Sequence, residues 1–244
     1  MVFRMTFPSG PLPVPDVVAD IAAGRAVRAV WHNELGGVTF RIGDGAEYVK
    51  TGPGDFAAEA ERLDWAGAYI RVPRVLGRGP DWLHTAGIAG FSAVDPRWAD
   101  DPGVAARAAG HGLRVLHDRL PVNSCPFDWS VPTRLAGLEP AARPALADPP
   151  PIDRLVVCHG AACTPNTLID ADGRYCGHVD LDALGVADRW ADLAVATMSL
   201  DWNYPDAAAG DWQGELLEAY GIAADTERID YYRRLWDAPE SAAG

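Results

Sequence analysis

The sequence has one lysine, four cysteines and no long uninterrupted apolar run. A membrane-spanning helix needs about 18 or more apolar residues in succession, and no window approaches that number. Residues 1–10 also contain no apolar run of the kind that forms a signal peptide. Four cysteines without a short paired framework favour reduced thiols, with a zinc site as the alternative. We therefore expect a cytoplasmic enzyme or binding protein.

Positive charge is also scarce. Asp and Glu number 34 against 21 Lys and Arg, so the formal net charge is −13 at pH 7. A surface of this sign repels nucleic acid and anionic membranes, because both are bound through Lys and Arg patches. We therefore expect neither of them as a partner, whereas a cationic ligand fits the charge. A solubility adaptation without any ligand explains the same charge equally well.

The 244 residues, 48% of them apolar, suffice for one or two domains with a sizeable core. Apolar alternation and short turns predict mainly strands before residue 87, and helical periodicity dominates after it. The expected strands are 27–32, 38–42, 47–50, 74–76, 82–85 and 152–158, with a hairpin of 167–170 and 176–179. The expected helices are 17–24, 55–65, 102–120, 190–200, 212–220 and 227–236. The pattern predicts an α+β fold with a small β-rich N-terminal lobe, residues 1–86, and a larger, mostly helical C-terminal lobe, residues 87–244.

The most specific segment is residues 156–170, followed closely by 178–180. A strand, a polar loop ending in Asn166, a hairpin and then Asp180 form a recognisable scaffold for phosphoryl transfer. The amide and carboxylate oxygens of these two residues are hard ligands that suit Mg²⁺, and the hairpin would bring them to one side. A loop Asn and a turn Asp without a metal are the alternative for either residue alone, but their order and context favour the metal.

These residues belong to a longer ordered set that closely resembles the aminoglycoside O-phosphotransferases, in particular the 3'-phosphotransferases. The resemblance is carried by C-H-G-x-A-C-x-P-N at 158–166, V-D-L at 179–181 and L-G-x-A-D-R-W-x-D-L-A at 184–194, and it covers roughly residues 27–237. It implies a two-lobed, protein-kinase-like fold and the activity of an antibiotic-resistance kinase.

The resemblance also implies roles for individual residues. Asn166 and Asp180 would bind the Mg²⁺ ions that bridge the phosphates of ATP or GTP. Lys50 would hold the α- and β-phosphates, and Glu59 would pair with Lys50 to fix it. An ordinary surface ion pair is the alternative for these two. Lys50 is the only lysine in the chain, which favours the functional interpretation.

Five further positions receive roles in the same way. Gly36 and Gly37 lie where the phosphate-covering loop belongs, although any hairpin turn would look alike. Thr85 and Gly87 occupy the linker whose backbone would hydrogen-bond the nucleotide base. His159 is expected to organise the catalytic loop through its ring nitrogens rather than to act as a base.

Position 161 departs from the pattern that the resemblance implies. The family has an Asp after His-Gly, the carboxylate that orients the substrate hydroxyl and accepts its proton, whereas this chain has Ala161. A general base typically contributes ~10²–10⁴ in rate, so low activity is expected. The chain is either an engineered Asp-to-Ala variant or a natural pseudokinase that binds nucleotide without transferring phosphate. The retention of the other site residues favours the engineered variant.

The acceptor side departs as well. The resemblance implies Gly-Arg where this chain has Asp182-Ala183, and of the acidic C-terminal cluster that binds drug ammonium groups only Asp237 is clearly present. Asp237 and Asp182 are therefore the expected contacts to a small cationic, hydroxyl-bearing acceptor. A kinase for another small hydroxyl-bearing compound is the alternative. We expect a monomer or a homodimer.

Overall fold

The computed structural model describes residues 7–8, 10–33, 36–205 and 210–239. The chain divides into two units, Val2–Ala89 and Gly90–Gly244. The last strand of the first unit ends at Ala86, and the division between the units lies three residues after it. No helix within the described residues is long and apolar enough to cross a membrane.

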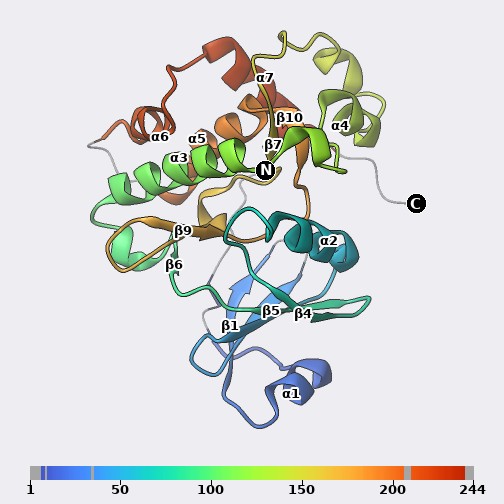
Figure 1. Cartoon of the computed structure of the whole chain (residues 1–244), viewed down its shortest axis with the longest axis vertical. Coiled ribbons are helices and arrows are strands. Elements are labelled where there is room, and N and C mark those ends of the chain that lie inside the picture. Colours follow the sequence, from blue (N-terminus) through green and yellow to red (C-terminus); the bar gives the residue numbers. More distant parts are fainter. Residues whose placement is uncertain (1–6, 9, 34–35, 206–209, 240–244) are drawn as a thin grey trace. The chain divides into compact units, whose positions relative to one another are not determined.

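The first unit is built on an antiparallel five-stranded sheet with the strand order β1-β2-β3-β5-β4 (Figure 1). Its elements are α1 (Asp16–Ala22), β1 (Val27–His32), β2 (Val38–Ile42), β3 (Glu47–Thr51), α2 (Phe56–Ala66), β4 (Val75–Arg78) and β5 (Trp82–Ala86). The β2–β3 turn uses Gly43 and Gly45, which both have positive φ, so the tight reversal costs no side-chain clash. The Asp55 side chain caps α2 by accepting a hydrogen bond from Ala58 N (2.9 Å). These local signals explain why the predicted meander and helix are confirmed.

The second unit is mainly helical. Its strands are β6 (Phe91–Ser92), β7 (Leu155–Cys158), β8 (Thr167–Ile169), β9 (Tyr175–His178) and β10 (Gly185–Asp188), and its α-helices are α3 (Pro102–Arg119), α4 (Val131–Gly137), α5 (Trp190–Asn203), α6 (Trp212–Tyr220) and α7 (Thr226–Trp236). Short 3₁₀ turns cover Pro96–Trp98, Val122–Ser124, Arg143–Leu146 and Thr164–Asn166. The strands form two small sheets, β10-β7 and β6-β8-β9. The predicted hairpin and long helices are confirmed within one to three residues.

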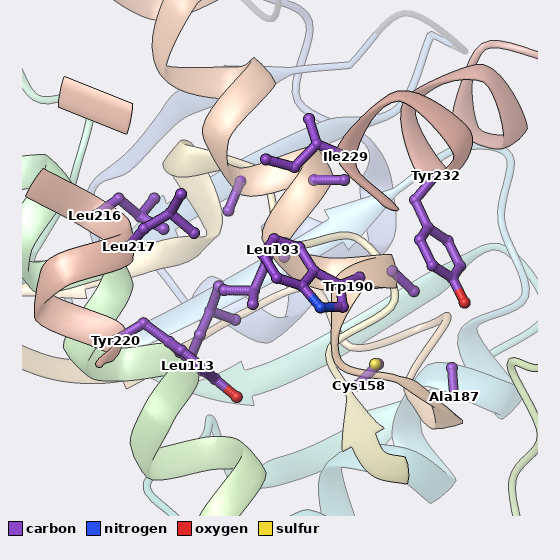
Figure 2. Packing of buried hydrophobic residues seen from close by; sticks show 14 of the residues in the cluster. Leu113, Cys158, Ala187, Trp190, Leu193, Leu216, Leu217, Tyr220, Ile229 and Tyr232 are labelled. Atoms are coloured by element: carbon purple, nitrogen blue, oxygen red, sulfur yellow. The ribbon is translucent and has the colours of Figure 1, made fainter. Parts of the chain in front are cut away.

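The core of this unit surrounds α5, whose residues 190–200 are all buried. Figure 2 shows Trp190 and Leu193 of α5 at the centre, with Leu216 and Leu217 of α6 on one side and Tyr232 of α7 on the other. Burying one large apolar side chain contributes about 1.5–3 kcal/mol, so this cluster fixes α5 firmly.

The backbones of helices α3 and α6 pack closely at Gly110 of α3. A side chain at this position would overlap the Leu216 carbonyl oxygen of α6, so glycine is required there. This packing matters for the site, because α3 and α5 both carry residues that hold the loop after β7.

One predicted strand needs correction, and one helix was missed. The predicted strand 152–158 begins only at Leu155, because its partner β10 is four residues long and pairs Asp188 with Leu155. Helix α4 was not predicted, because its Pro- and Ala-rich stretch shows no apolar periodicity. None of the four cysteines forms a disulfide.

Candidate active site

The first unit brings the predicted Lys50 and Glu59 together. Lys50 lies on β3 and Glu59 in the first turn of α2, and Lys50 Nζ donates to Glu59 Oε1 over 2.6 Å. The Glu59 side chain is 5% exposed and that of Lys50 is 25% exposed. A hydrogen bond to a charged group contributes about 1.5–3 kcal/mol, more than an exposed surface pair. The pair therefore holds the ammonium in a fixed position at the end of the strand.

The predicted glycine loop folds back on the end of the same strand. Asn33 Oδ1 accepts from Gly37 N (2.6 Å), and Gly36 has a φ of +87°. A side chain at Gly52 would come within 2.8 Å of the Gly37 Cα, so the two backbones touch. Gly52 was missed by the sequence analysis, although its place between Thr51 and Pro53 in a glycine- and proline-rich turn was a signal.

The predicted base-binding linker is closely packed within the first unit. Thr85 pairs with Tyr48 across β3 and β5. Gly87 N donates to the Ala46 carbonyl (2.7 Å), and a side chain at Gly87 would overlap the Gly45 carbonyl oxygen. The Gly87 N–H is thus already engaged within the unit, and glycine is required there for close approach rather than for a free donor.

In the second unit, the loop after β7 is held by a buried carboxylate that the sequence analysis assigned no role. Asp192, in the first turn of α5, accepts from His159 N (2.6 Å) and Gly160 N (3.0 Å). His117 of α3 lies 3.0 Å from it through Nε2 and contacts the Tyr220 hydroxyl (2.9 Å) through Nδ1.

Burial alone would raise the pKa of Asp192, but the hydrogen bond and charge of His117 and the backbone donors outweigh it and lower the pKa. Asp192 therefore stays ionised, so it keeps both oxygens as acceptors. The place of Asp192 in the motif D-R-W-x-D-L-A, residues 188–194, was the signal in the sequence that could have identified it.

The His159 ring contacts backbone groups of two segments. Its Nε2 lies 3.0 Å from the Val179 carbonyl, and because a carbonyl only accepts, Nε2 carries the proton. Its Nδ1 then accepts from Ala161 N (3.4 Å). Burial lowers the pKa of His159, so the ring is neutral. The ring links the loop to the segment that ends in Asp180.

Asn166 and Asp180 are brought side by side by the backbone. Val179 N donates to the Asn166 carbonyl (3.1 Å), so the residue next to Val179 lies beside Asn166. Asp180 has a φ of +67°, a left-handed conformation that costs a non-glycine residue roughly 1–2 kcal/mol. Such strain gathers at functional sites.

The donors of this pair fit a divalent cation. Asn166 Nδ2 donates to the Ala161 carbonyl (3.0 Å), so the amide nitrogen is engaged by the protein and the amide oxygen is the atom suited to a metal. An amide oxygen beside a carboxylate is a hard donor set of the kind that Mg²⁺ takes.

Ala161 takes part in the loop only through its backbone. Its carbonyl accepts from Cys163 N (2.7 Å) and Asn166 Nδ2 (3.0 Å), and its N–H faces His159 Nδ1. The methyl group of Ala161 takes part in none of these hydrogen bonds, and the residue is partly exposed. These hydrogen bonds of the loop therefore do not depend on the side chain at position 161.

The two predicted acceptor contacts lie on different elements. Asp182 is exposed in the turn that follows Asp180. Asp237 ends α7, where its N–H donates to the Arg233 carbonyl (3.0 Å).

The described residues hold one group with metal-like donors outside the predicted pair, His117, Cys158 and Asp192. Cys158 Sγ donates to the Asp188 carbonyl (3.4 Å), and burial raises the pKa of this thiol well above its usual value. In the structure these three side chains are therefore engaged with protein groups, Cys158 with Asp188 and His117 with Asp192 and Tyr220.

The fold is that of the kinase-like phosphotransferases. Residues 17–232 match the sequence model described as the phosphotransferase enzyme family, and the chain belongs to this family.

The chain is similar to known kinases of aminoglycosides. It is 30% identical to an aminoglycoside 3'-phosphotransferase of Streptomyces fradiae, and the match covers 84% of this chain and 93% of the relative. It is 32% identical to a streptomycin 3''-kinase of Streptomyces griseus, and that match covers 85% of this chain and 90% of the relative. The aminoglycoside phosphotransferase APH(3'')-Id of Streptomyces rimosus, solved in complex with ADP and streptomycin, aligns with a TM-score of 0.68 at 26% identity and covers 91% of this chain and 98% of its own. The predicted resemblance and the α+β, kinase-like fold are confirmed.

Proposed function

We propose that this protein transfers the γ-phosphate of ATP or GTP to a hydroxyl of an aminoglycoside-type acceptor. The observation that carries the proposal is the pairing of Asn166 with a left-handed Asp180 through the Val179 N–Asn166 O bond. Similar proteins act on aminoglycosides, and one similar structure holds ADP and streptomycin. The acidic composition, with a formal net charge of −13, suits a cationic acceptor.

In this proposal the first unit binds the nucleotide, and the second provides the catalytic and acceptor-binding residues. The Lys50 ammonium, held by Glu59, binds the α- and β-phosphates. Mg²⁺, held by Asn166 and Asp180, would neutralise negative charge on the phosphates. His159 and Asp192 keep the loop in place and do not touch the reacting atoms.

Position 161 limits the rate in this proposal. A methyl group neither orients the acceptor hydroxyl nor accepts its proton, and a positioned base contributes ~10²–10⁴ in rate. Ala161→Asp restores a carboxylate without changing any backbone bond of the loop. We expect this variant to phosphorylate an aminoglycoside faster than the unchanged chain.

The test measures ATP- and GTP-dependent phosphorylation of an aminoglycoside panel by both proteins. Ala171→Asp is a matched control, because it adds the same charge at an exposed turn of the β8–β9 hairpin. An Ala161→Asp protein that is folded and transfers no phosphate to any acceptor contradicts the proposal.

The methyl group at position 161 also favours a second candidate, a nucleotide-binding protein that transfers nothing. It predicts that Mg²⁺–nucleotide raises the unfolding temperature of the chain and that Ala161→Asp gains no activity on any hydroxyl compound. A third candidate is a kinase for another small hydroxyl-bearing acceptor. A thermal-shift screen of aminoglycosides and neutral hydroxyl compounds, with Mg²⁺ and nucleotide present, distinguishes it, because a neutral compound and not an aminoglycoside would then raise the unfolding temperature.

A further inference from the structure

The reaction proposed above needs a carboxylate beside the acceptor hydroxyl, and two carboxylates near the catalytic loop have other tasks. Asp192 is fully buried and accepts hydrogen bonds from two backbone N–H groups and from His117. The hydroxyl compound that receives the phosphate therefore cannot reach its carboxylate. Asp180 follows Val179, whose N–H donates to the Asn166 carbonyl, and in the function proposed above its carboxylate would hold Mg²⁺. Any further carboxylate must come from another segment that touches the loop.

Such a segment is the tight turn of residues 181–184, which directly follows the cation site. Leu184 N donates to the Leu181 carbonyl (3.1 Å) and closes the turn. Leu181 and Leu184 are both fully buried, so both ends of the turn are anchored in the core. Asp182 lies between these anchors and is exposed. A polar residue at the tip of a turn with buried ends is held in place without being removed from solvent.

This turn packs directly on the residue before Ala161. A side chain at Gly160 would overlap the Ala183 carbonyl oxygen and lie 2.7 Å from the Ala183 Cβ. Gly160 also has a φ of +85°, so both its conformation and this contact require glycine. The backbones of the turn and the loop are therefore in van der Waals contact. Asp182 precedes Ala183 in the turn, and Ala161 follows Gly160 in the loop. Each of them is therefore one residue away from the contact between Gly160 and Ala183.

We propose that Asp182 is a catalytic residue that supplies the carboxylate missing at position 161. The inference rests on the proposed function. The acceptor hydroxyl oxygen forms a bond to the γ-phosphorus, the bond from that phosphorus to the bridging oxygen breaks, and the nucleoside diphosphate leaves. The hydroxyl proton passes to the Asp182 carboxylate, which orients the hydroxyl beforehand. Asp182 thus contributes to the chemical step and not only to binding of the acceptor.

The test is a double-mutant cycle with Asp182→Asn and Ala161→Asp, measured as kcat and acceptor KM on an aminoglycoside. In the unchanged chain we expect Asp182→Asn to lower kcat at least ~10-fold with acceptor KM nearly unchanged. In the Ala161→Asp background the same substitution should change kcat less than about threefold, because the restored carboxylate takes over the role. Asp172→Asn, in the exposed turn of the β8–β9 hairpin, controls for loss of one negative charge.

The remaining outcomes overturn the inference and separate it from the proposed function. An unchanged kcat in Asp182→Asn, an equal loss in both backgrounds, or a raised KM alone each excludes Asp182 as the catalytic carboxylate. If only the Ala161→Asp proteins transfer phosphate, the inference fails and the proposed function stands. If no variant transfers phosphate or binds Mg²⁺–nucleotide in calorimetry, both fail. Thermal unfolding of Asp182→Asn must match the unchanged chain, so that a lower kcat is not caused by unfolding.

Discussion

Replacing Asp192 tests how the loop after β7 is held, and the test needs no substrate. Asp192→Asn keeps the size of the side chain and replaces one acceptor oxygen by an NH₂ donor. In the structure Oδ1 accepts from Gly160 N, and Oδ2 accepts from His159 N and lies beside His117 Nε2. Either orientation of the new amide therefore places its NH₂ against a backbone N–H. We expect a large loss of stability.

The magnitude follows from these bonds. A hydrogen bond to a charged group contributes about 1.5–3 kcal/mol, and a buried donor left without an acceptor costs about 1–3 kcal/mol. Asp192→Asn removes at least one such bond and leaves at least one donor unpaired at a site that is 0% exposed. The free energy of unfolding should fall by about 3–5 kcal/mol, the range found when one partner of a buried charged pair is removed.

Urea unfolding at pH 7, followed by tryptophan fluorescence, measures this loss. Asp172→Asn is the matched control, because its side chain is 69% exposed and should change the unfolding free energy by no more than about 0.5 kcal/mol. A loss in Asp192→Asn below about 1 kcal/mol would refute the view that this carboxylate holds the loop.

The dependence of this loss on pH provides a second check. The pKa of Asp192 is lowered in the folded chain from its ordinary value of 3.8. Its contribution is therefore present above pH 3.8 and is lost as the pH falls through the folded-state pKa. The difference between Asp192→Asn and the unchanged chain should be constant from pH 7 to about pH 5 and shrink below pH 4.

Two further predictions concern a buried histidine and the lysine pair. Burial lowers the pKa of His178 from 6.5 to about 3, so the unfolded chain takes up the proton first and stability should fall below pH 6.5 by up to ~1.4 kcal/mol per pH unit. His178→Phe should flatten that slope in urea unfolding between pH 7 and pH 4, and an unchanged slope would exclude His178 as its source. Lys50→Met should weaken Mg²⁺–nucleotide binding roughly 10–100-fold in calorimetry, because it removes an ammonium–phosphate contact of about 1.5–3 kcal/mol. Binding equal to that of the unchanged chain would show that Lys50 does not contact the phosphates.

The first unit was largely predictable from the sequence because its signals are local. Strand alternation, glycine turns and the Asp55 cap each act within a few residues, and the strands β1 and β2 agree with the prediction residue for residue. The Lys50–Glu59 contact was expected from the family resemblance, and not from a local pattern.

The support of the catalytic loop was not predictable in the same way. His117, Asp192 and Tyr220 lie on three helices far apart in the sequence, and their contacts depend on how α3, α5 and α6 pack. No local pattern states that a buried carboxylate will face the backbone of a loop more than 30 residues before it. Strand β10 was missed for the same reason, since its four residues are a strand only because β7 lies beside them.

The way the loop is held bears on the meaning of Ala161. The sequence analysis took the retention of the neighbouring site residues as favouring an engineered replacement, on the reasoning that natural loss of the base would erode them. In the structure the bonds of the loop involve the backbone of residue 161, the ring of His159 and the carboxylate of Asp192. None of them uses the side chain at position 161, so loss of a carboxylate there would leave the hydrogen bond from Asn166 Nδ2 to the Ala161 carbonyl in place. Retention of the neighbouring residues is therefore expected after either kind of replacement, and it does not favour the engineered one.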